Sequence, residues 1–276
     1  MRHIAATLRA LLVPLLVGAL VPVAIQPAAA QSGAEAPEDP AMAKPAHAAW
    51  TRLLKAYVRE GADGVTRVDY GALKASTPDR AALDAYIESF ENMDLSGVGP
   101  AEFAAWANLY NAVTVRYIVE KYPTRSIRTG LFGGPWKSIK VRAGGRTVSL
   151  DEIEHQILRP RFQDPLVHYA INCAAWSCPN LQPKAWEAAT LQADLEAAAR
   201  QYVNHARGVT VTDRGLVVSG IYDWFEKDFG GTKDGVVSHL LTYASPPLAA
   251  QIRANPRIRK YEYDWSLNDT AKAPAK

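Results

Sequence analysis

Hydrophobic positions recur at two spacings along this chain, and together they predict its secondary structure. Apolar residues three and four apart indicate helices, while short runs rich in branched and aromatic residues indicate strands. The helical spacing occurs at residues 50–58, 81–90, 100–122, 150–159, 191–204, 219–229, 236–243 and 248–254. The strand pattern occurs at residues 65–70, 138–142, 146–148, 166–172, 209–212, 216–219 and 258–264. Because the strands are mostly hairpin-connected, we expect an α+β single domain, with helices packed on a small antiparallel or mixed sheet.

Local signals set several of these boundaries. Gly144-Gly145 suits the positive φ angles of a tight turn, so a hairpin is expected around it. Ser149 and Glu152 have the spacing of a capping box that starts the next helix. Pro160 is expected to stop that helix, since proline lacks the N–H that the helix needs.

The two ends of the chain differ in composition from its centre. Residues 1–30 combine a basic start, an apolar body and three alanines at 28–30, which is the layout of a secretory signal peptide. We therefore expect export, to a bacterial periplasm, with cleavage after the last of these alanines. No second long apolar run follows, so no stable membrane span is expected after signal removal. Residues 31–45 are expected to form a flexible lead-in, 46–267 one folded domain, and 268–276 a disordered tail.

Charge adds little to this picture. The chain has 31 Lys and Arg against 28 Asp and Glu, and loss of Arg2 and Arg9 with the signal leaves 29 basic residues. No basic stripe with interleaved aromatic residues is present, so a nucleic-acid partner is not expected.

Four polar side chains are predicted inside the fold. In a strand at 166–172, His168 and Asn172 would point to the same face. Asn108 and Asn111 lie three apart on one helical face, among large apolar residues. Two interpretations remain open: a buried polar network that fixes helix against sheet, or a polar pocket where they meet. We expect all four side chains at one junction. The pocket interpretation requires the asparagines to lie within about 8 Å of the His168 ring, the limit for contact through one water.

Cys173 and Cys178 are spaced C-x4-C. In an exported protein a disulfide is the default, provided that residues 174–177 form a turn. Thiol exchange is the weaker idea, because the pair is not a C-x-x-C motif. A third possibility is that Cys178 is a nucleophile with His168 as its base, since Cys173 would point to the opposite face of the predicted strand.

Two further groups have structural explanations beside functional ones. His155 lies near the end of a predicted helix, where the helix dipole favours a histidine. The acids between 151 and 154 have no metal-ligand spacing relative to it, and no HxxxH or HxH motif occurs, so no metal or other cofactor is expected. Asp228 lies one helical turn from Trp224 and could orient a histidine, although a capping or salt-bridge role is the commoner one.

Several segments in order resemble the domain of unknown function 547 family. They are NLYN at 108–111, YPTRSI at 122–127, SLDEIEHQILR at 149–159, DPLVHYAINCAAWSCP at 164–179, the run from 219 to 229, and YDWSLN at 263–268. The resemblance implies no activity, since none is established for the family. The order of an NLYN helix and a histidine-bearing strand is also similar to the papain and transglutaminase-like layout. That layout implies a cysteine at the start of the helix, and the helix here has none.

Two functions of different classes therefore stand side by side. One is a non-catalytic binding or scaffold domain with a polar pocket for an unknown small-molecule or peptide ligand, in which the cysteines are bridged. The other is a hydrolase or transferase of peptide-like or thiol substrates that uses His168 and Cys178 with Asn108 and Asn111. Lack of a recognisable nucleophile and base favours the binding domain.

Overall fold

The computed structural model describes residues 47–128 and 134–271. They all belong to one compact unit, Glu38–Lys276. The predicted signal peptide and lead-in lie outside the described residues, as do residues 129–133 and 272–276.

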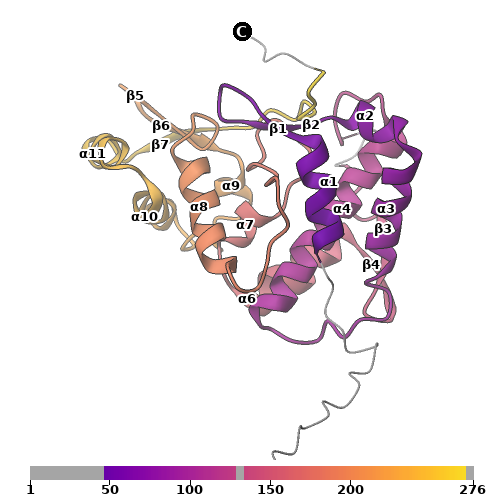
Figure 1. The fold of residues 1–276 in the computed structure, drawn as a ribbon. Helices are drawn as coiled ribbons and strands as arrows, with labels where there is room; N and C mark the ends of the chain where they lie inside the picture. The colour runs from indigo at the N-terminus through magenta and orange to yellow at the C-terminus, as the bar shows by residue number, and fades with distance from the viewer. Residues whose placement is uncertain (1–46, 129–133, 272–276) are drawn as a thin grey trace, which may run out of the picture. The chain divides into compact units, whose positions relative to one another are not determined.

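The first half of the described unit is built from helices. These are α1 (Ala48–Tyr57), α2 (Tyr70–Ala75), α3 (Thr77–Glu88) and α4 (Pro100–Lys121). Helix α4 is central: every residue from Phe103 to Val115 is buried, and α2 and α3 pack against it (Figure 1). A helix buried on all sides needs no polar face, which explains its run of alanines, aromatics and branched residues. It leaves helical geometry at Tyr122, the residue before Pro123.

The strands form three small sheets in the part of the chain that the structure describes. Two are antiparallel pairs, β1 (Val58–Glu60) with β2 (Thr66–Val68) and β3 (Lys140–Ala143) with β4 (Arg146–Ser149). The third contains β5 (Val209–Thr212), β6 (Gly215–Ser219) and β7 (Ile258–Glu262), with β7 parallel to β6. Gly144 and Gly145 take φ angles of 58° and 74° in the predicted turn. The α+β class and the mixed sheet are confirmed, although the strands are divided among three sheets.

The helix that follows β4 runs further than predicted. Ser149 Oγ accepts the Glu152 N–H and the Glu152 carboxylate accepts the Ser149 N–H, so the capping box is confirmed. Helical turns then continue through α5 (Leu150–Glu152), the π-helix η2 (Ile153–Leu158) and α6 (Arg159–Phe162). The prediction that Pro160 stops the helix is wrong. The Arg159 N–H bonds to the Glu154 carbonyl, and such a widened turn accommodates a proline ring and its missing N–H.

The predicted strand at 166–172 is wrong, because the chain forms a single helical turn there, α7 (Val167–Ala170). The Asp164 side chain accepts the Leu166 N–H, and Pro165 between them has the φ angle of a first helical turn. Every residue from 166 to 172 is buried. The continuous apolar run therefore indicated burial on all sides rather than a strand, and the predicted alternation of faces does not hold.

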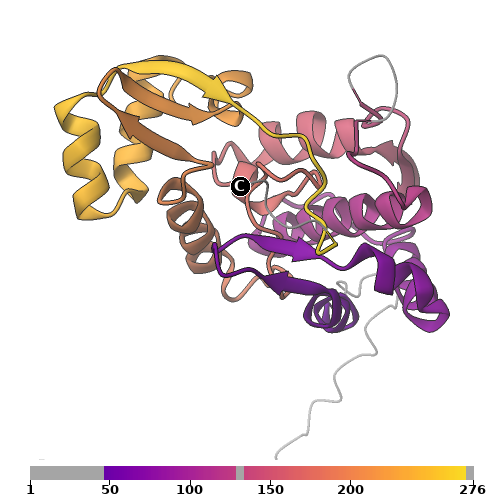
Figure 2. The same cartoon turned by 90° about the horizontal axis from the view of Figure 1, so that it is seen from above.

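The second half of the unit combines the mixed sheet with four further helices. They are α8 (Leu191–Val203), α9 (Ile221–Trp224), α10 (Lys233–Tyr243) and α11 (Pro246–Ala254). Helix α8 packs on α7 and α10, and Figures 1 and 2 show α10 and α11 beside the sheet, away from α1 to α4. The helix predicted through Phe229 ends at Trp224. Phe225 leaves helical geometry and its ring stacks on His168, so tertiary packing overrides the helical pattern.

The folded unit continues past the predicted end of the domain at residue 267. The Val68 N–H donates to the Asn268 carbonyl, and the Tyr70 hydroxyl donates to Asn268 Oδ1 at 2.8 Å. Asn268 and Asp269 are both buried. The prediction of a tail from 268 onward therefore began too early, since these polar residues find partners in the first half of the unit.

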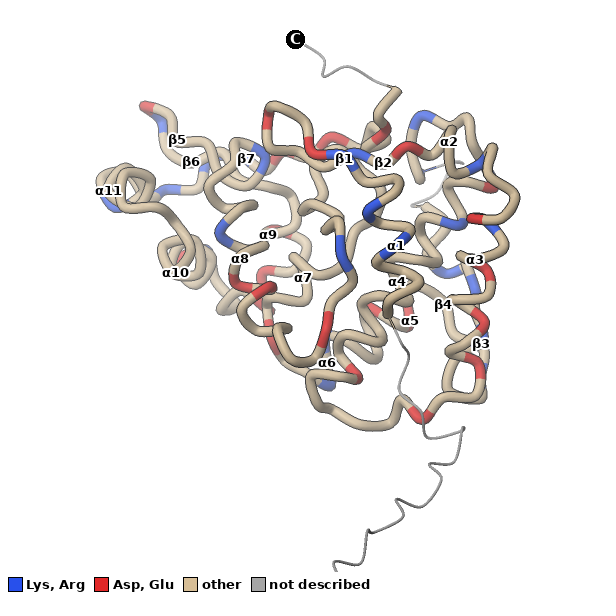
Figure 3. Tube along the Cα trace, viewed as in Figure 1, with Lys and Arg blue, Asp and Glu red and all other residues tan. Residues whose placement is uncertain are grey.

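Two surface properties bear on possible partners. No helix of the described residues is both long enough and apolar enough to cross a membrane. Lysine and arginine are interspersed with aspartate and glutamate along the described trace (Figure 3).

Candidate functional site

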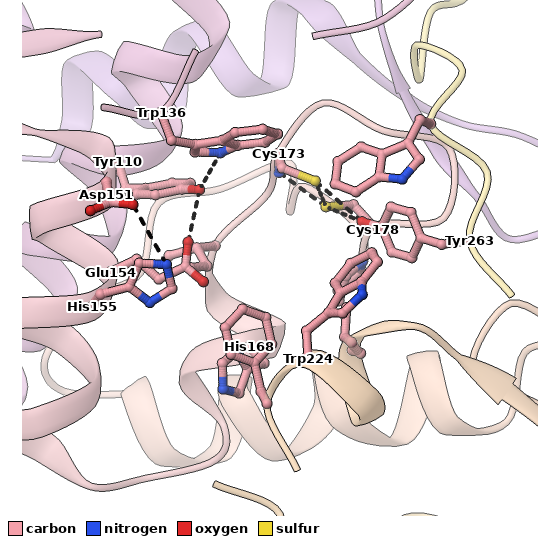
Figure 4. Close-up of a pocket in the computed structure, with 15 residues that line it drawn as sticks. Tyr110, Trp136, Asp151, Glu154, His155, His168, Cys173, Cys178, Trp224 and Tyr263 are labelled. Carbon is pink, nitrogen blue, oxygen red and sulfur yellow. Dashed lines mark hydrogen bonds and ion pairs between the residues drawn. The ribbon is translucent and has the colours of Figure 1, made fainter. Parts of the chain in front are cut away.

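A cavity of about 380 Å³ lies between the helix that starts at Leu150 and the loop that carries the cysteines. One side presents Asp151, Glu154 and His155, and another presents Cys173 and Cys178 (Figure 4). A space of this size is typical of sites for small organic molecules.

The two cysteines lie side by side on a tight loop. Both are free thiols in the structure, and their Sγ atoms are 2.6 Å apart. The Cys178 N–H donates to the Ala175 carbonyl, and Asn172 Oδ1 accepts the Ala174 N–H, so the loop is held at both ends. The turn that a disulfide requires is present, while the predicted disulfide itself is not.

Three donors surround the sulfur of Cys178. The Cys173 N–H lies 3.0 Å from it, the Cys173 thiol 2.6 Å and the Tyr263 hydroxyl 3.2 Å. Burial raises the pKa of Cys178, but hydrogen bonds from Cys173 and Tyr263 outweigh burial and hold that pKa below its usual range. The hydrogen bond to Cys178, followed by burial, raises the pKa of Cys173. The pair therefore favours a thiolate at Cys178 and a proton on Cys173.

A buried carboxyl occupies the facing wall. Glu154 is 8% exposed, and its Oε2 accepts the Tyr110 hydroxyl at 3.2 Å. Tyr110 in turn accepts the indole N–H of Trp136 at 3.2 Å. Burial raises the pKa of Glu154 from 4.5 to about 7, against the smaller lowering effects of Tyr110 and Arg159. A carboxyl with this pKa can both donate and accept a proton near neutral pH.

His155 lies on the same helical segment and faces a second carboxyl, that of Asp151. Its Nδ1 lies 2.9 Å from an Arg159 nitrogen, and since a guanidinium only donates, the neutral ring carries its proton on Nε2. That Nε2 lies 4.0 Å from Asp151 Oδ1. Burial and the charge of Arg159 lower the pKa of His155. Arg159 is held in turn by two hydrogen bonds to Asp228, of 2.5 and 3.0 Å.

His168 borders the same cavity but is engaged elsewhere. Its Nε2 lies 2.7 Å from Asp228 Oδ2, and its ring packs against Phe225 and Phe229 with centroids 4.1 and 5.1 Å away. Burial lowers the pKa of His168 more than Asp228 raises it. Asp228 thus contacts both a histidine and, through its ion pair with Arg159, a cation, so it combines the orienting and salt-bridge roles that the sequence left open. Within the described residues no hydrogen bond joins His168 to Cys178, the nucleophile that the sequence paired with it.

The asparagines predicted to meet His168 hold the backbone instead. Asn111 donates to the Ala170 carbonyl and accepts the Asn172 N–H, at 2.9 and 2.7 Å. Asn108 makes the equivalent pair of bonds to the N–H and carbonyl of Trp186. Neither asparagine lines the cavity among the described residues, nor does Asn172, whose amide donates to the Pro179 carbonyl. The asparagines therefore hold backbone segments together, and no described hydrogen bond joins any of them to His168.

Aromatic rings complete the cavity wall. Trp224 stacks on Trp265 at 5.4 Å between centroids, and Tyr263 lies 4.8 and 4.6 Å from the two. Trp136 meets Trp265 edge to face at 5.8 Å. Trp224 is 48% exposed, which is unusual for a large apolar side chain.

Glu154, His155 and Tyr263 are the residues whose roles the sequence did not reveal. In a regular helix the charged residues around Glu154 would indicate an exposed surface. The π-helix widens the turn that contains this residue. Pro160 inside the helical pattern was the available signal of an irregular helix. Tyr263 lies far from the cysteines in sequence, and its contact with them is purely tertiary.

Residues 99–203 match a family model described as "Protein of unknown function, DUF547". The resemblance to the domain of unknown function 547 family is thus confirmed for this segment, which runs from α4 to α8 and includes Glu154 and both cysteines. The segments at 219–229 and 263–268 lie outside the match. No curated protein and no solved structure matches the chain. The strand-borne histidine of the papain-like layout is absent from the described residues, since His168 lies on helix α7.

Proposed function

We propose that this protein is an exported thiol-dependent catalyst in which Cys178 attacks a small molecule bound in the cavity and Cys173 resolves the product. The single observation that carries the proposal is the convergence of three donors on the Cys178 sulfur at the wall of a cavity. Donors to a sulfur stabilise the thiolate, which is the reactive form. The predicted signal peptide agrees with this, because an exported dithiol meets disulfide-bonded molecules.

The reaction that suits the site is thiol–disulfide exchange. The Cys178 thiolate attacks one sulfur of a substrate disulfide, forms a mixed disulfide and expels the other half as a thiolate, which takes a proton from Glu154. Cys173 then gives its proton to the Glu154 carboxylate and attacks the Cys178 sulfur. The second substrate thiolate leaves, and a Cys173–Cys178 disulfide remains. Two electrons pass from the dithiol to the substrate, which leaves as one thiol and one thiolate, and Glu154 is again protonated.

The test uses the chain without its predicted signal, with small disulfides in single turnover. Iodoacetamide labelling followed against pH should give an apparent pKa at Cys178 below that of the unfolded chain, and Cys178→Ser should abolish exchange. Cys173→Ser should stop at the mixed disulfide, visible as a mass increase by one substrate half. Labelling of Cys178 no faster than in the unfolded chain at every pH would contradict the proposal.

A non-catalytic binding domain is the second candidate. It is favoured by one observation: among the described residues no hydrogen bond links either sulfur to a histidine or a carboxylate. In that case the double variant Cys173→Ser/Cys178→Ser would bind ligand as the wild type does, and the wild type would show no exchange. Hydrolysis or acyl transfer with His168 as base is less well supported, since the Nε2 of that ring is bonded to Asp228.

A further inference from the structure

The aromatic wall of the cavity forms one connected cluster. Its four members are Trp136, Trp224, Tyr263 and Trp265, whose centroids are linked by distances of 4.6 to 5.8 Å. They come from segments far apart in the chain. These rings could pack against any bulky apolar ligand. The faces of aromatic rings also attract a positive charge. The Arg128 guanidinium already lies 4.9 Å from the Trp265 centroid, so this cluster accepts a cation on one of its rings.

The charges around the cavity have one sign. Asp151 and Glu154 line it, whereas no Lys or Arg side chain is among the described residues that do. Glu154 is more than nine-tenths buried, and only its Oε2 has a hydrogen-bond partner within the described chain. In Figure 4 its carboxyl group points into the space between the helix and the cysteine loop. The nearest guanidinium, that of Arg159, is committed to Asp228 and His155.

We propose that the cavity selects substrates that carry an organic cation, a quaternary ammonium or alkylammonium group seated between the aromatic cluster and Glu154. This assignment names the substrate class of the thiol reaction and rests on that proposed function, although the cation seat itself uses neither sulfur. The aromatic faces supply the apolar contact that a methylated ammonium needs, and the carboxylates supply its counter-charge.

Entry of a cation is coupled to the protonation of Glu154. The groups that act on this carboxyl are Tyr110 from α4, Asp151 and Arg159 from its own helical segment, and Asp228 from the loop after α9. His155 also lines the cavity beside it. A positive charge beside Glu154 lowers its pKa below the value of about 7 that burial gives it. Binding near neutral pH therefore releases a proton, whereas binding well above that pKa does not.

The experiment compares choline with its neutral carbon isostere, 3,3-dimethylbutan-1-ol, by isothermal titration calorimetry. Choline should bind the wild type at least about tenfold more tightly, since only the charge differs between the probes. Its binding enthalpy near pH 7 should vary with the ionisation enthalpy of the buffer, and that dependence should vanish at pH 9. Glu154→Gln should remove most of the preference, while Glu226→Gln, which alters a carboxylate outside the cavity lining, should keep it.

The double variant Cys173→Ser/Cys178→Ser separates this inference from the thiol chemistry. It should retain the preference for choline, because the seat needs no sulfur. Equal binding of the two probes to the wild type, or binding of neither, would overturn the cation seat and leave disulfide exchange to stand or fall by its own test. Choline binding without any exchange would support the seat and remove the thiol function.

Discussion

The protein contains two groups of buried polar side chains that differ in what their atoms contact. In the first group, the side-chain amides of Asn108 and Asn111 each donate one hydrogen bond to the backbone and accept one from it. The Nε2 of His168 is bonded to Asp228. Glu154 and the cysteine pair, by contrast, face a cavity. Satisfied polar groups fix a structure, whereas a polar group kept buried with capacity to spare is the stronger indication of chemistry.

The two groups should also respond differently to substitution. Removing a satisfied asparagine leaves a buried backbone group such as the Asn172 N–H unpaired, so the fold loses stability. Removing Glu154 relieves the burial of a charge, so the fold gains stability while the site loses its acid. The predictions that follow test this contrast in order of expected effect.

Asn111→Ala should have the largest effect. The Asn172 N–H loses its acceptor and the Ala170 carbonyl loses a donor, so unfolding should become easier by about 4 kcal/mol. Urea unfolding measures this loss. Asn108→Ala is the matched control, because it removes an equivalent pair of bonds to Trp186. Both variants should be destabilised, and only Asn111→Ala should slow Cys178 labelling, since Asn111 holds the loop's start. If Cys178 is labelled at the same rate in both variants, Asn111 does not control the position of the cysteine loop.

Glu154→Gln should stabilise the fold at high pH, whereas most substitutions of buried residues destabilise it. In the folded protein the pKa of Glu154 is about 7, above its ordinary value of 4.5. The contribution of this carboxyl to the free energy of unfolding therefore falls as the pH rises from 4.5 to about 7 and is constant above that. Below about pH 4 the variant should match the wild type, and at pH 8 it should be more stable by roughly 3 kcal/mol. Urea unfolding at the two pH values gives the comparison. A pH-independent difference would mean that the folded carboxyl is not protonated more readily than the unfolded one.

His168→Ala should lower stability by about 2 kcal/mol and leave thiol chemistry intact. The ring fills space beside Phe225 and Phe229 and bonds to Asp228, and all of these contacts are lost. Labelling of Cys178 should stay within about twofold of the wild type, because no described contact joins the ring to either sulfur. A folded variant with labelling slowed tenfold would restore His168 as the base of Cys178.

How far the sequence predicts this structure depends on where the determining contacts lie. Helix α4 and the hairpin at Gly144-Gly145 were predictable, because apolar spacing and turn residues act within a few positions. The strand predicted at 166–172 failed since a fully buried run has no periodicity to distinguish it from a helix. The Asp164-Pro165 start was the better signal there.

The candidate site was predictable only in part. The sequence pointed to the cysteines and to a turn between them, and that turn is present, although it follows a helical turn and not the predicted strand. It could not show that Asn111 would bind backbone, that Glu154 would turn inward, or that Tyr263 would reach the sulfurs. Each of those depends on contacts between segments tens of residues apart, which no local pattern encodes.

Tyr263→Phe should have the smallest effect and is the most direct test of the thiolate. The substitution keeps the ring packed against Trp224 and Trp265 and removes one O–H donor to Cys178. A hydrogen bond to a charged group contributes about 1.5 kcal/mol, so the pKa of Cys178 should rise by about one unit. Labelling near pH 7 should then slow by up to about tenfold and recover at high pH, where the thiol ionises without help. Tyr261→Phe is the matched control, because this tyrosine lies two residues earlier, on β7, and its hydroxyl is buried with no described partner. That variant should label as the wild type does. If the two variants behave alike, the hydroxyl of Tyr263 does not stabilise the thiolate, and the reactivity of Cys178 rests on Cys173 alone.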